Sequence, residues 1–208
     1  MRNKENNLSG EYLILAGLML IALVTLGLQV VRIFNVWNIA EFGAIGGVIL
    51  AWILIFFGAS AMGEASAEFK KVRIASAAMV IVTILQGILA FKNLKSGMMN
   101  QAYIDVTVMF AAYLGLLGLF YTYRTLLRGT ALLIKREDPV LARGCMRAWK
   151  PACGIVILTM ILIPISAMMP RIVEYIATGV LACLGLLAQG YMCKLLLDGK
   201  TTLDDARM

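Results

Sequence analysis

The chain has 208 residues, of which 61% are hydrophobic and 15% charged, and its mean hydropathy is +0.86. Soluble domains carry about 45–50% apolar and about 25% charged residues, so this composition excludes an ordinary soluble protein and indicates an integral membrane protein. The sequence contains no histidine, which excludes Ser-His nucleophile pairs, histidine-bound zinc and histidine proton relays.

Six apolar segments follow one another along the chain. They predict an all-α integral membrane protein, a single domain over 1–208, with transmembrane helices at about 12–31, 42–63, 74–91, 104–123, 151–170 and 172–193. Each contains a charge-free run close to the roughly 20 residues that a helix needs to cross a bilayer core of about 30 Å. The first run is too long for the core of a signal peptide, so we expect it to be an uncleaved span. The spans pair into three consecutive helical hairpins.

Lysine and arginine residues alternate between the two sides of this predicted domain. Fifteen of the 19 basic residues fall on the side that holds both termini and the second and fourth connections. The positive-inside rule therefore predicts that both termini are cytoplasmic. The net charge of +7 is explained by a basic inner face that contacts anionic headgroups, and no nucleic-acid partner is expected. Short loops and the lack of a recognisable sorting signal favour a bacterial cytoplasmic membrane.

The fourth and sixth spans resemble each other at an offset of 70 residues. The run at 114–117 recurs at 184–187, Tyr121 corresponds to Tyr191, and Gly129 corresponds to Gly199. Each odd span also has a threonine near mid-membrane, and each even span begins near one acidic residue. This pattern predicts a hairpin used three times with pseudo-threefold packing. Chance similarity between apolar segments is the alternative.

Three acidic residues lie at the outer starts of the even spans: Glu41, Asp105 and Glu174. A carboxylate in the first turn of a helix is stabilised by the unpaired N–H groups and the positive end of the helix dipole, which is the favoured interpretation. The alternative hypothesis is a cation-binding mouth formed by the three carboxylates.

Four uncharged polar residues inside or near the spans are candidates for an intramembrane site: Gln29, Gln86, Tyr113 and Gln189. Hydrogen bonds between helices explain such residues in most membrane proteins. The alternative is a site for a neutral or weakly polar ligand, which a cavity that reaches Gln86, Tyr113 and Gln189 would favour. The lack of an ionisable residue near any span centre argues against a proton-driven or sodium-driven pump.

Small residues form rows on the even spans, and Gly43 and Gly47 make a GxxxG pair. Close packing between helices of the same chain is the favoured interpretation, and dimerisation through this face is the alternative.

The connection over about 124–150 is predicted to be cytoplasmic and amphipathic. The fourth span continues toward Arg136, and Asp138 then caps a new helix that has a proline at its first position. In that helix Arg143, Arg147 and Lys150 share one face, which suits a helix on the inner membrane surface. A passive interfacial connector is the favoured interpretation, and a docking site for a soluble partner or a specific anionic-lipid site is the alternative. Pro151 is predicted to begin the fifth span.

Four cysteines, Cys145, Cys153, Cys183 and Cys193, lie within the membrane or at its inner face in this topology. A structural disulfide is not expected, because cytosolic thiols are kept reduced. Their spacing does not match a metal-binding motif, so neither a metal nor any other cofactor is expected.

The chain contains no recognisable enzyme motif, and a non-enzymatic protein is expected. The first hypothesis is a membrane subunit, scaffold or regulator. The alternative is a small-solute transport component or the ligand-capturing subunit of a transporter. In size and number of spans the chain is similar to the substrate-binding subunits of energy-coupling-factor transporters, but the small residues of its first span lack the regular spacing of that family, so the similarity is limited to size and topology.

Overall fold

The computed structural model describes residues 6–34, 37–96, 101–166 and 171–205 of the chain. Within these ranges it leaves out the side chains at 6–9, 28–34, 37–42, 90–96, 101–109, 111–112, 163–164, 166, 171–172, 174–175, 178 and 204. The described chain forms six helices: α1 (Asn6–Phe34), α2 (Trp37–Ala61), α3 (Ala67–Ser96), α4 (Gln101–Ile134), α5 (Pro139–Ser166) and α6 (Arg171–Asp205). The prediction of an all-α protein is confirmed.

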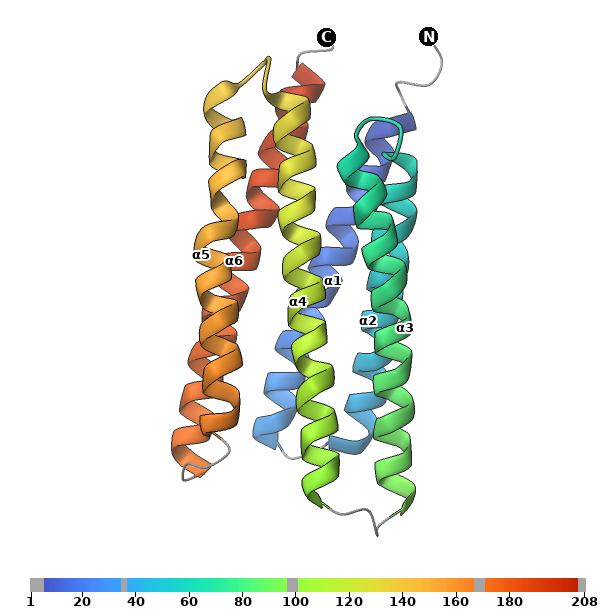
Figure 1. Cartoon of the computed structure of the whole chain (residues 1–208), viewed down its shortest axis with the longest axis vertical. Coiled ribbons are helices and arrows are strands. Elements are labelled where there is room, and N and C mark those ends of the chain that lie inside the picture. Colours follow the sequence, from blue (N-terminus) through green and yellow to red (C-terminus); the bar gives the residue numbers. More distant parts are fainter. Residues whose placement is uncertain (1–5, 35–36, 97–100, 167–170, 206–208) are drawn as a thin grey trace.

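The six helices run along one common axis, and consecutive helices are antiparallel (Figure 1). α1 begins and α6 ends at the same end of the bundle, where the α2–α3 and α4–α5 turns also lie. We call this the charged end, because its turns and the adjoining helix ends hold most of the charged residues of the sequence. Separation of the charges from the apolar middle of the helices is the arrangement expected of membrane spans.

Five helices, α1, α2, α3, α5 and α6, contain a described segment long and apolar enough to cross a membrane. The chain is therefore a multi-pass membrane protein by length and composition. The outer half of the fourth predicted span falls largely on α4 side chains outside the description, so that span stays a prediction. With 34 residues, α4 is about 51 Å long at 1.5 Å per residue, which exceeds the bilayer core of about 30 Å.

Each helix contacts the next along the chain, and α6 also contacts α1 and α4. α1, α2, α3, α4 and α6 thus form a closed ring in the described structure, and α5 packs on the outside against α4 and α6. A threefold hairpin repeat would need counterparts of the α4–α6 contact between α2 and α4 and between α2 and α6. The described residues of those pairs are not in contact, so the contacts are not threefold equivalent and the repeat stays a prediction.

α1 and α2 pack with their backbones in direct contact, and glycine makes this possible. A methyl group at Gly17 would lie 2.6 Å from the carbonyl oxygen of Ala51, and one at Gly58 would collide with the carbonyl oxygen of Gly10. Helix association in lipid depends on such close backbone approach, because lipid tails are as apolar as the side chains. We call this contact the α1–α2 seam.

The predicted GxxxG pair divides between two environments. A methyl group at Gly47 would lie 2.8 Å from Cγ2 of Val24, so Gly47 belongs to the α1–α2 seam. Gly43 faces open space, since a methyl group there would meet nothing within 4 Å. Gly47 therefore packs within the chain as predicted, and Gly43 adds nothing to this seam.

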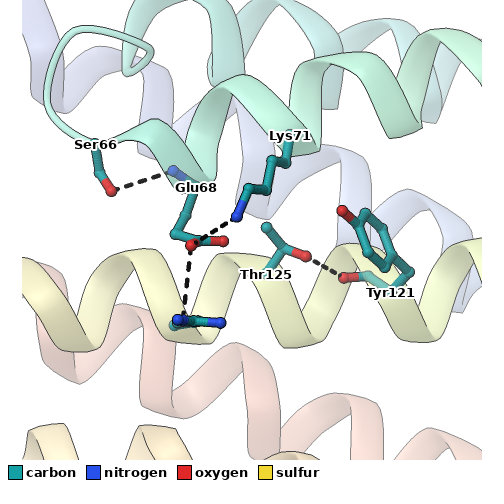
Figure 2. Close-up of polar contacts among 6 residues, drawn as sticks. Ser66, Glu68, Lys71, Tyr121 and Thr125 are labelled. Atoms are coloured by element: carbon teal, nitrogen blue, oxygen red, sulfur yellow. Dashed lines mark hydrogen bonds and ion pairs between the residues drawn. The ribbon is translucent and has the colours of Figure 1, made fainter.

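At the charged end, Ser66 begins α3 and Glu68 joins α3 to α4 (Figure 2). The Ser66 hydroxyl accepts a hydrogen bond from the Glu68 backbone N–H at 3.3 Å, as expected of an N-cap. The Glu68 carboxylate, which is buried, lies 3.0 Å from Nζ of Lys71 and 3.6 Å from Nε of Arg128. These contacts hold the first turn of α3 against α4.

The α4–α5 turn forms as predicted. The Asp138 carboxylate accepts hydrogen bonds from the backbone N–H groups of Val140 and Leu141, both at 2.9 Å, and Pro139 is the first residue of α5. Two of the unpaired N–H groups at the start of the helix are thereby satisfied.

The predicted boundary at Pro151 is not present, because α5 runs through it without interruption from Pro139 to Ser166. The predicted surface helix and the fifth span are one rod aligned with the bundle (Figure 1). Ala148 and Ala152, on either side of the proline, are both buried. The helix continues where the proline removes one backbone hydrogen bond, and small residues pack against the bundle on both sides of this position.

Candidate functional site

A cavity of about 360 Å³ lies between α1, α4, α5 and α6. This volume falls within the range of about 300–1,000 Å³ that is typical of ligand pockets. Its wall is formed by Thr25 of α1; Leu116, Leu119, Phe120 and Tyr123 of α4; Ala152, Ile155, Val156 and Thr159 of α5; and Leu181, Ala182, Gly185, Leu186, Ala188, Gln189 and Met192 of α6.

The cavity begins where α4 and α6 separate. These parallel helices touch near the charged end, where the Tyr123 hydroxyl lies 3.6 Å from Sγ of Cys193 and a methyl group at Gly199 would lie 2.5 Å from Cγ2 of Thr130. From Tyr123 onward, toward the opposite end of the bundle, residues of both helices line the cavity. Small residues contribute to its volume, since a methyl group at Gly185 would meet nothing within 4 Å.

The wall is apolar except for four side chains, and these have hydrogen bonds within the protein. The hydroxyl of Thr25 donates to the carbonyl oxygen of Ile21 at 2.8 Å, and that of Thr159 donates to Ile155 at 2.8 Å. Threonine hydroxyls in membrane helices commonly donate a hydrogen bond to a backbone carbonyl group of the preceding turn. The donors of these two hydroxyls are therefore used within their own helices.

The other two polar groups connect helices at the charged side of the cavity. The Gln189 amide donates to the Leu18 carbonyl oxygen at 3.0 Å and joins α6 to α1, while the Tyr123 hydroxyl and the Cys193 thiol join α4 to α6. Gln189, Tyr123 and Cys193 are all buried. Together they tie the three ring helices beside the cavity.

The four polar residues proposed from the sequence do not form one site. Gln189 lines the cavity, whereas the Tyr113 hydroxyl donates to the Met160 carbonyl oxygen at 2.8 Å across the α4–α5 contact. Nε2 of Gln86 lies 3.9 Å from the position of a methyl group at Gly115, across the α3–α4 contact. These three side chains therefore lie at three different helix contacts, and the Gln29 side chain is outside the description. The cavity between α1, α4, α5 and α6 is lined by Gln189 but by neither Gln86 nor Tyr113.

The predicted acidic mouth stays a prediction, because the side chains of Glu41, Asp105 and Glu174 fall outside the described part of the chain.

The predicted basic face lies on α5. Its residues Arg143, Arg147 and Lys150 are exposed, on the face opposite to buried Ala142 and Cys145. Among the described residues, three or more acidic or cysteine side chains do not come close enough together to hold a metal ion. All four cysteines are free thiols.

The sequence analysis missed two charged residues that are buried at the charged end, Glu11 and Lys200, with exposed fractions of 3% and 5%. Nζ of Lys200 donates to the Tyr12 hydroxyl at 2.9 Å and lies 4.1 Å from the centre of the Tyr12 ring. For Lys200, the contact with Tyr12 of α1, which residue spacing along α6 does not reveal, distinguishes the side chain from an exposed charge.

The chain matches no protein-family model, and comparison with the curated proteins and with the solved structures gave no match.

Proposed function

We propose that the chain is a non-enzymatic membrane protein that captures a small apolar or amphipathic molecule in the cavity between α1, α4, α5 and α6. The observation that carries this proposal is the cavity itself, of about 360 Å³, with a mostly apolar wall between the four helices. Small-molecule sites in proteins are usually concave, mostly apolar pockets of about this size. A ligand-capturing component is therefore favoured among the two functions expected from the sequence.

The wall favours an apolar ligand over a sugar or an ion. The hydroxyls of Thr25 and Thr159 and an amide N–H of Gln189 donate hydrogen bonds to backbone carbonyl groups. The wall therefore offers a polar solute few hydrogen-bond donors, and each hydrogen bond to water that is lost without replacement costs several kcal/mol by order of magnitude. If the protein takes part in transport, we infer that its cargo is mainly apolar.

Cavity filling provides the direct test. The change Gly185→Leu places a side chain in the cavity, whereas Gly190→Leu places the same side chain on the exposed surface of the same helix, where a methyl group also meets nothing within 4 Å. The full chain is purified in mild detergent with added phosphatidylcholine, and bound molecules are measured by native mass spectrometry. We expect Gly185→Leu to lose the retained molecule and Gly190→Leu to keep it. Equal retention by both variants would contradict ligand capture in this cavity.

The membrane arrangement is part of the same proposal: six spans, with α4 as the fourth, the charged end in the cytoplasm, and the protein in a bacterial cytoplasmic membrane. The basic residues of the charged end support this orientation. In a variant without the native cysteines, Glu64→Cys at the α2–α3 turn should resist a membrane-impermeant maleimide in intact cells, whereas Ser96→Cys at the other end of α3 should react. Reaction of Glu64→Cys and protection of Ser96→Cys would show that the charged end lies outside the cytoplasm and would contradict the proposed topology.

The α4–α6 contact is consistent with duplication of a hairpin. Tyr123 and Cys193, which touch, are separated by the same 70 positions that relate the similar segments of the two helices. We propose that the hairpins α3–α4 and α5–α6 share this repeat. The sequence similarity that would extend the repeat to the hairpin α1–α2 is weaker.

A second candidate function is that of a subunit or regulator that binds a protein partner at the charged end. The observation that favours it is the exposed basic face of α5, formed by Arg143, Arg147 and Lys150. Changing these three residues to glutamine leaves the cavity wall intact. Loss of cellular function in that variant with normal ligand retention would favour the partner-binding role.

A further inference from the structure

The charged side of the cavity ends in a stack of two aromatic rings and one cation. Phe120 lines the cavity, and its ring centre lies 6.4 Å from that of Trp149 in an edge-to-face arrangement. Cζ of Arg124 lies 4.8 Å from the centre of the Trp149 ring. This distance is within the range of a cation–π contact, so the indole holds the guanidinium in place. We call Phe120, Trp149 and Arg124 the rim stack.

Arg124 and Trp149 lie one helical turn from two wall residues, toward the charged end. Arg124 follows Phe120 by four residues on α4, and Trp149 precedes Ala152 by three residues on α5, so each lies on the same helix face as that wall residue. Arg124 is exposed, while Phe120 and Ala152 are apolar. An apolar chamber with a fixed cation at one end is complementary to an amphiphile with an acidic head.

From this juxtaposition we propose that the cavity takes one acyl chain of an anionic glycerophospholipid and that Arg124, positioned by Trp149, binds its phosphate. The guanidinium stays charged at any physiological pH and offers several donors to phosphate oxygens. Tryptophan rings in membrane proteins concentrate at the level of the headgroups, which puts the phosphate of a bilayer lipid beside the rim stack. The inference rests on the proposed ligand capture and adds the chemical class of the ligand.

The cavity volume favours one chain over two. At about 360 Å³ it lies at the lower end of the range for ligand pockets, which suits a single slender tail. The second acyl chain would remain in the surrounding bilayer, so that the lipid is held by one tail and by its head.

The test is a competition between two lipids with the same acyl chains. The full chain is purified in detergent with an equimolar mixture of phosphatidylglycerol and phosphatidylcholine, and the bound ratio is read by native mass spectrometry. We expect the wild type to prefer phosphatidylglycerol. Arg124→Gln should reduce that preference about threefold to tenfold, as for a partly exposed charge-assisted hydrogen bond, while one lipid stays bound.

Arg73→Gln is the matched control, because it removes one positive charge from an exposed position on α3 at the same end of the bundle. It should leave the ratio near that of the wild type. Arg124→Lys, which keeps the charge, should retain part of the preference and guards against loss of folding as the explanation. Equal effects of Arg124→Gln and Arg73→Gln would overturn the assignment, since general surface charge would then account for the preference.

Gly185→Leu separates the two proposals. If it removes both lipids while Arg124→Gln has no effect on their ratio, ligand capture stands and the phosphate site is wrong. If it removes neither, both proposals fail. A further measurement on the wild type adds oleate at the same concentration as phosphatidylglycerol. Displacement of phosphatidylglycerol by oleate would show that the acidic ligand is a free fatty acid. That result would overturn the phospholipid assignment.

Discussion

The α1–α2 seam and the cavity beside α6 use the same residue type in opposite ways. In the seam, Gly10 and Gly58 face each other's carbonyl oxygens so closely that neither position has room for a methyl group. On α6, Gly185 faces a space in which a methyl group would meet nothing within 4 Å. Glycine brings two backbones together in the first region and leaves volume in the second.

This difference shows that a row of small residues has no single structural meaning in a membrane protein. Packing of helices in lipid relies on van der Waals contact and on interhelical hydrogen bonds, without a hydrophobic driving force between them. The seam supplies contact, whereas the helices around the cavity are tied by Gln189, Tyr123 and Cys193. We therefore expect substitutions in the two regions to differ in both size and sign.

The largest effect is expected in the seam. Gly58→Ala should destabilise the protein by about 2–3 kcal/mol, because the added methyl group collides with the backbone of α1. Gly43→Ala, on the same helix but facing open space, should be neutral or stabilise by up to about 1 kcal/mol through helix propensity. Unfolding in mixed detergent micelles, followed by circular dichroism, measures both. Similar losses in the two variants would mean that α1 and α2 do not pack in this way.

The next effect concerns the tie between α6 and α1. Gln189→Leu keeps the approximate size of the side chain but removes its hydrogen bond to the Leu18 carbonyl oxygen. Interhelical hydrogen bonds in membranes contribute about 0.6 kcal/mol on average and up to about 1.7, so we expect a loss of about 1 kcal/mol in the same unfolding assay. Tyr113→Phe, which removes the bond to Met160, is the parallel case across the α4–α5 contact. A gain in stability for Gln189→Leu would contradict the tie.

In the cavity, filling should be tolerated. After removal of bound lipid, Gly185→Leu should leave the free energy of unfolding unchanged or raise it by up to about 1 kcal/mol, since leucine is the better helix former and has space. The sign is thus opposite to that at Gly58. A loss comparable to that of Gly58→Ala would show that the cavity is closed in the lipid-free protein.

The smallest effect is expected at the α3–α4 contact, which depends on charge. Glu68→Gln weakens the contacts with Lys71 and Arg128, whose side chains are half exposed. Screening by solvent limits the loss to less than about 1 kcal/mol, and it should shrink as salt is added. Glu64→Gln, at an exposed position nearby, is the control. A loss that does not change with salt would assign the effect of Glu68 to packing.

Local signals were read correctly from the sequence, while contacts between helices were not. Asp138 and Pro139 predict a helix start from chemistry confined to one turn, and both hydrogen bonds of the cap are present. Pro151 also resembles a helix start locally, but burial of the neighbouring alanines keeps α5 continuous. The local cost of a proline is outweighed by packing that depends on helices distant in sequence.

The candidate site shows the same limit. Spacing along a helix indicates which side chains share a face, but not which helix that face meets. The sequence predicts Gln189 at a helix contact or at a ligand site, and in the structure it donates to Leu18 across the α1–α6 contact and lines the cavity. Its predicted companions Gln86 and Tyr113 face other helix pairs. The rim stack could not be predicted from the sequence, because Arg124 and Trp149 lie on different helices and residue spacing does not indicate which helices pack together.

The position of α5 has a mechanical consequence. In the described part of the chain α5 touches only α4 and α6, and these two touch each other directly. The contacts that close the ring of the other five helices therefore do not involve α5, although α5 supplies four of the residues that line the cavity. Access to the cavity can thus change through the contacts of α5 with α4 and α6 alone, without breaking a contact within the ring. Because α5 is one continuous helix from Pro139 to Ser166, its exposed basic residues and its cavity residues belong to the same rigid segment.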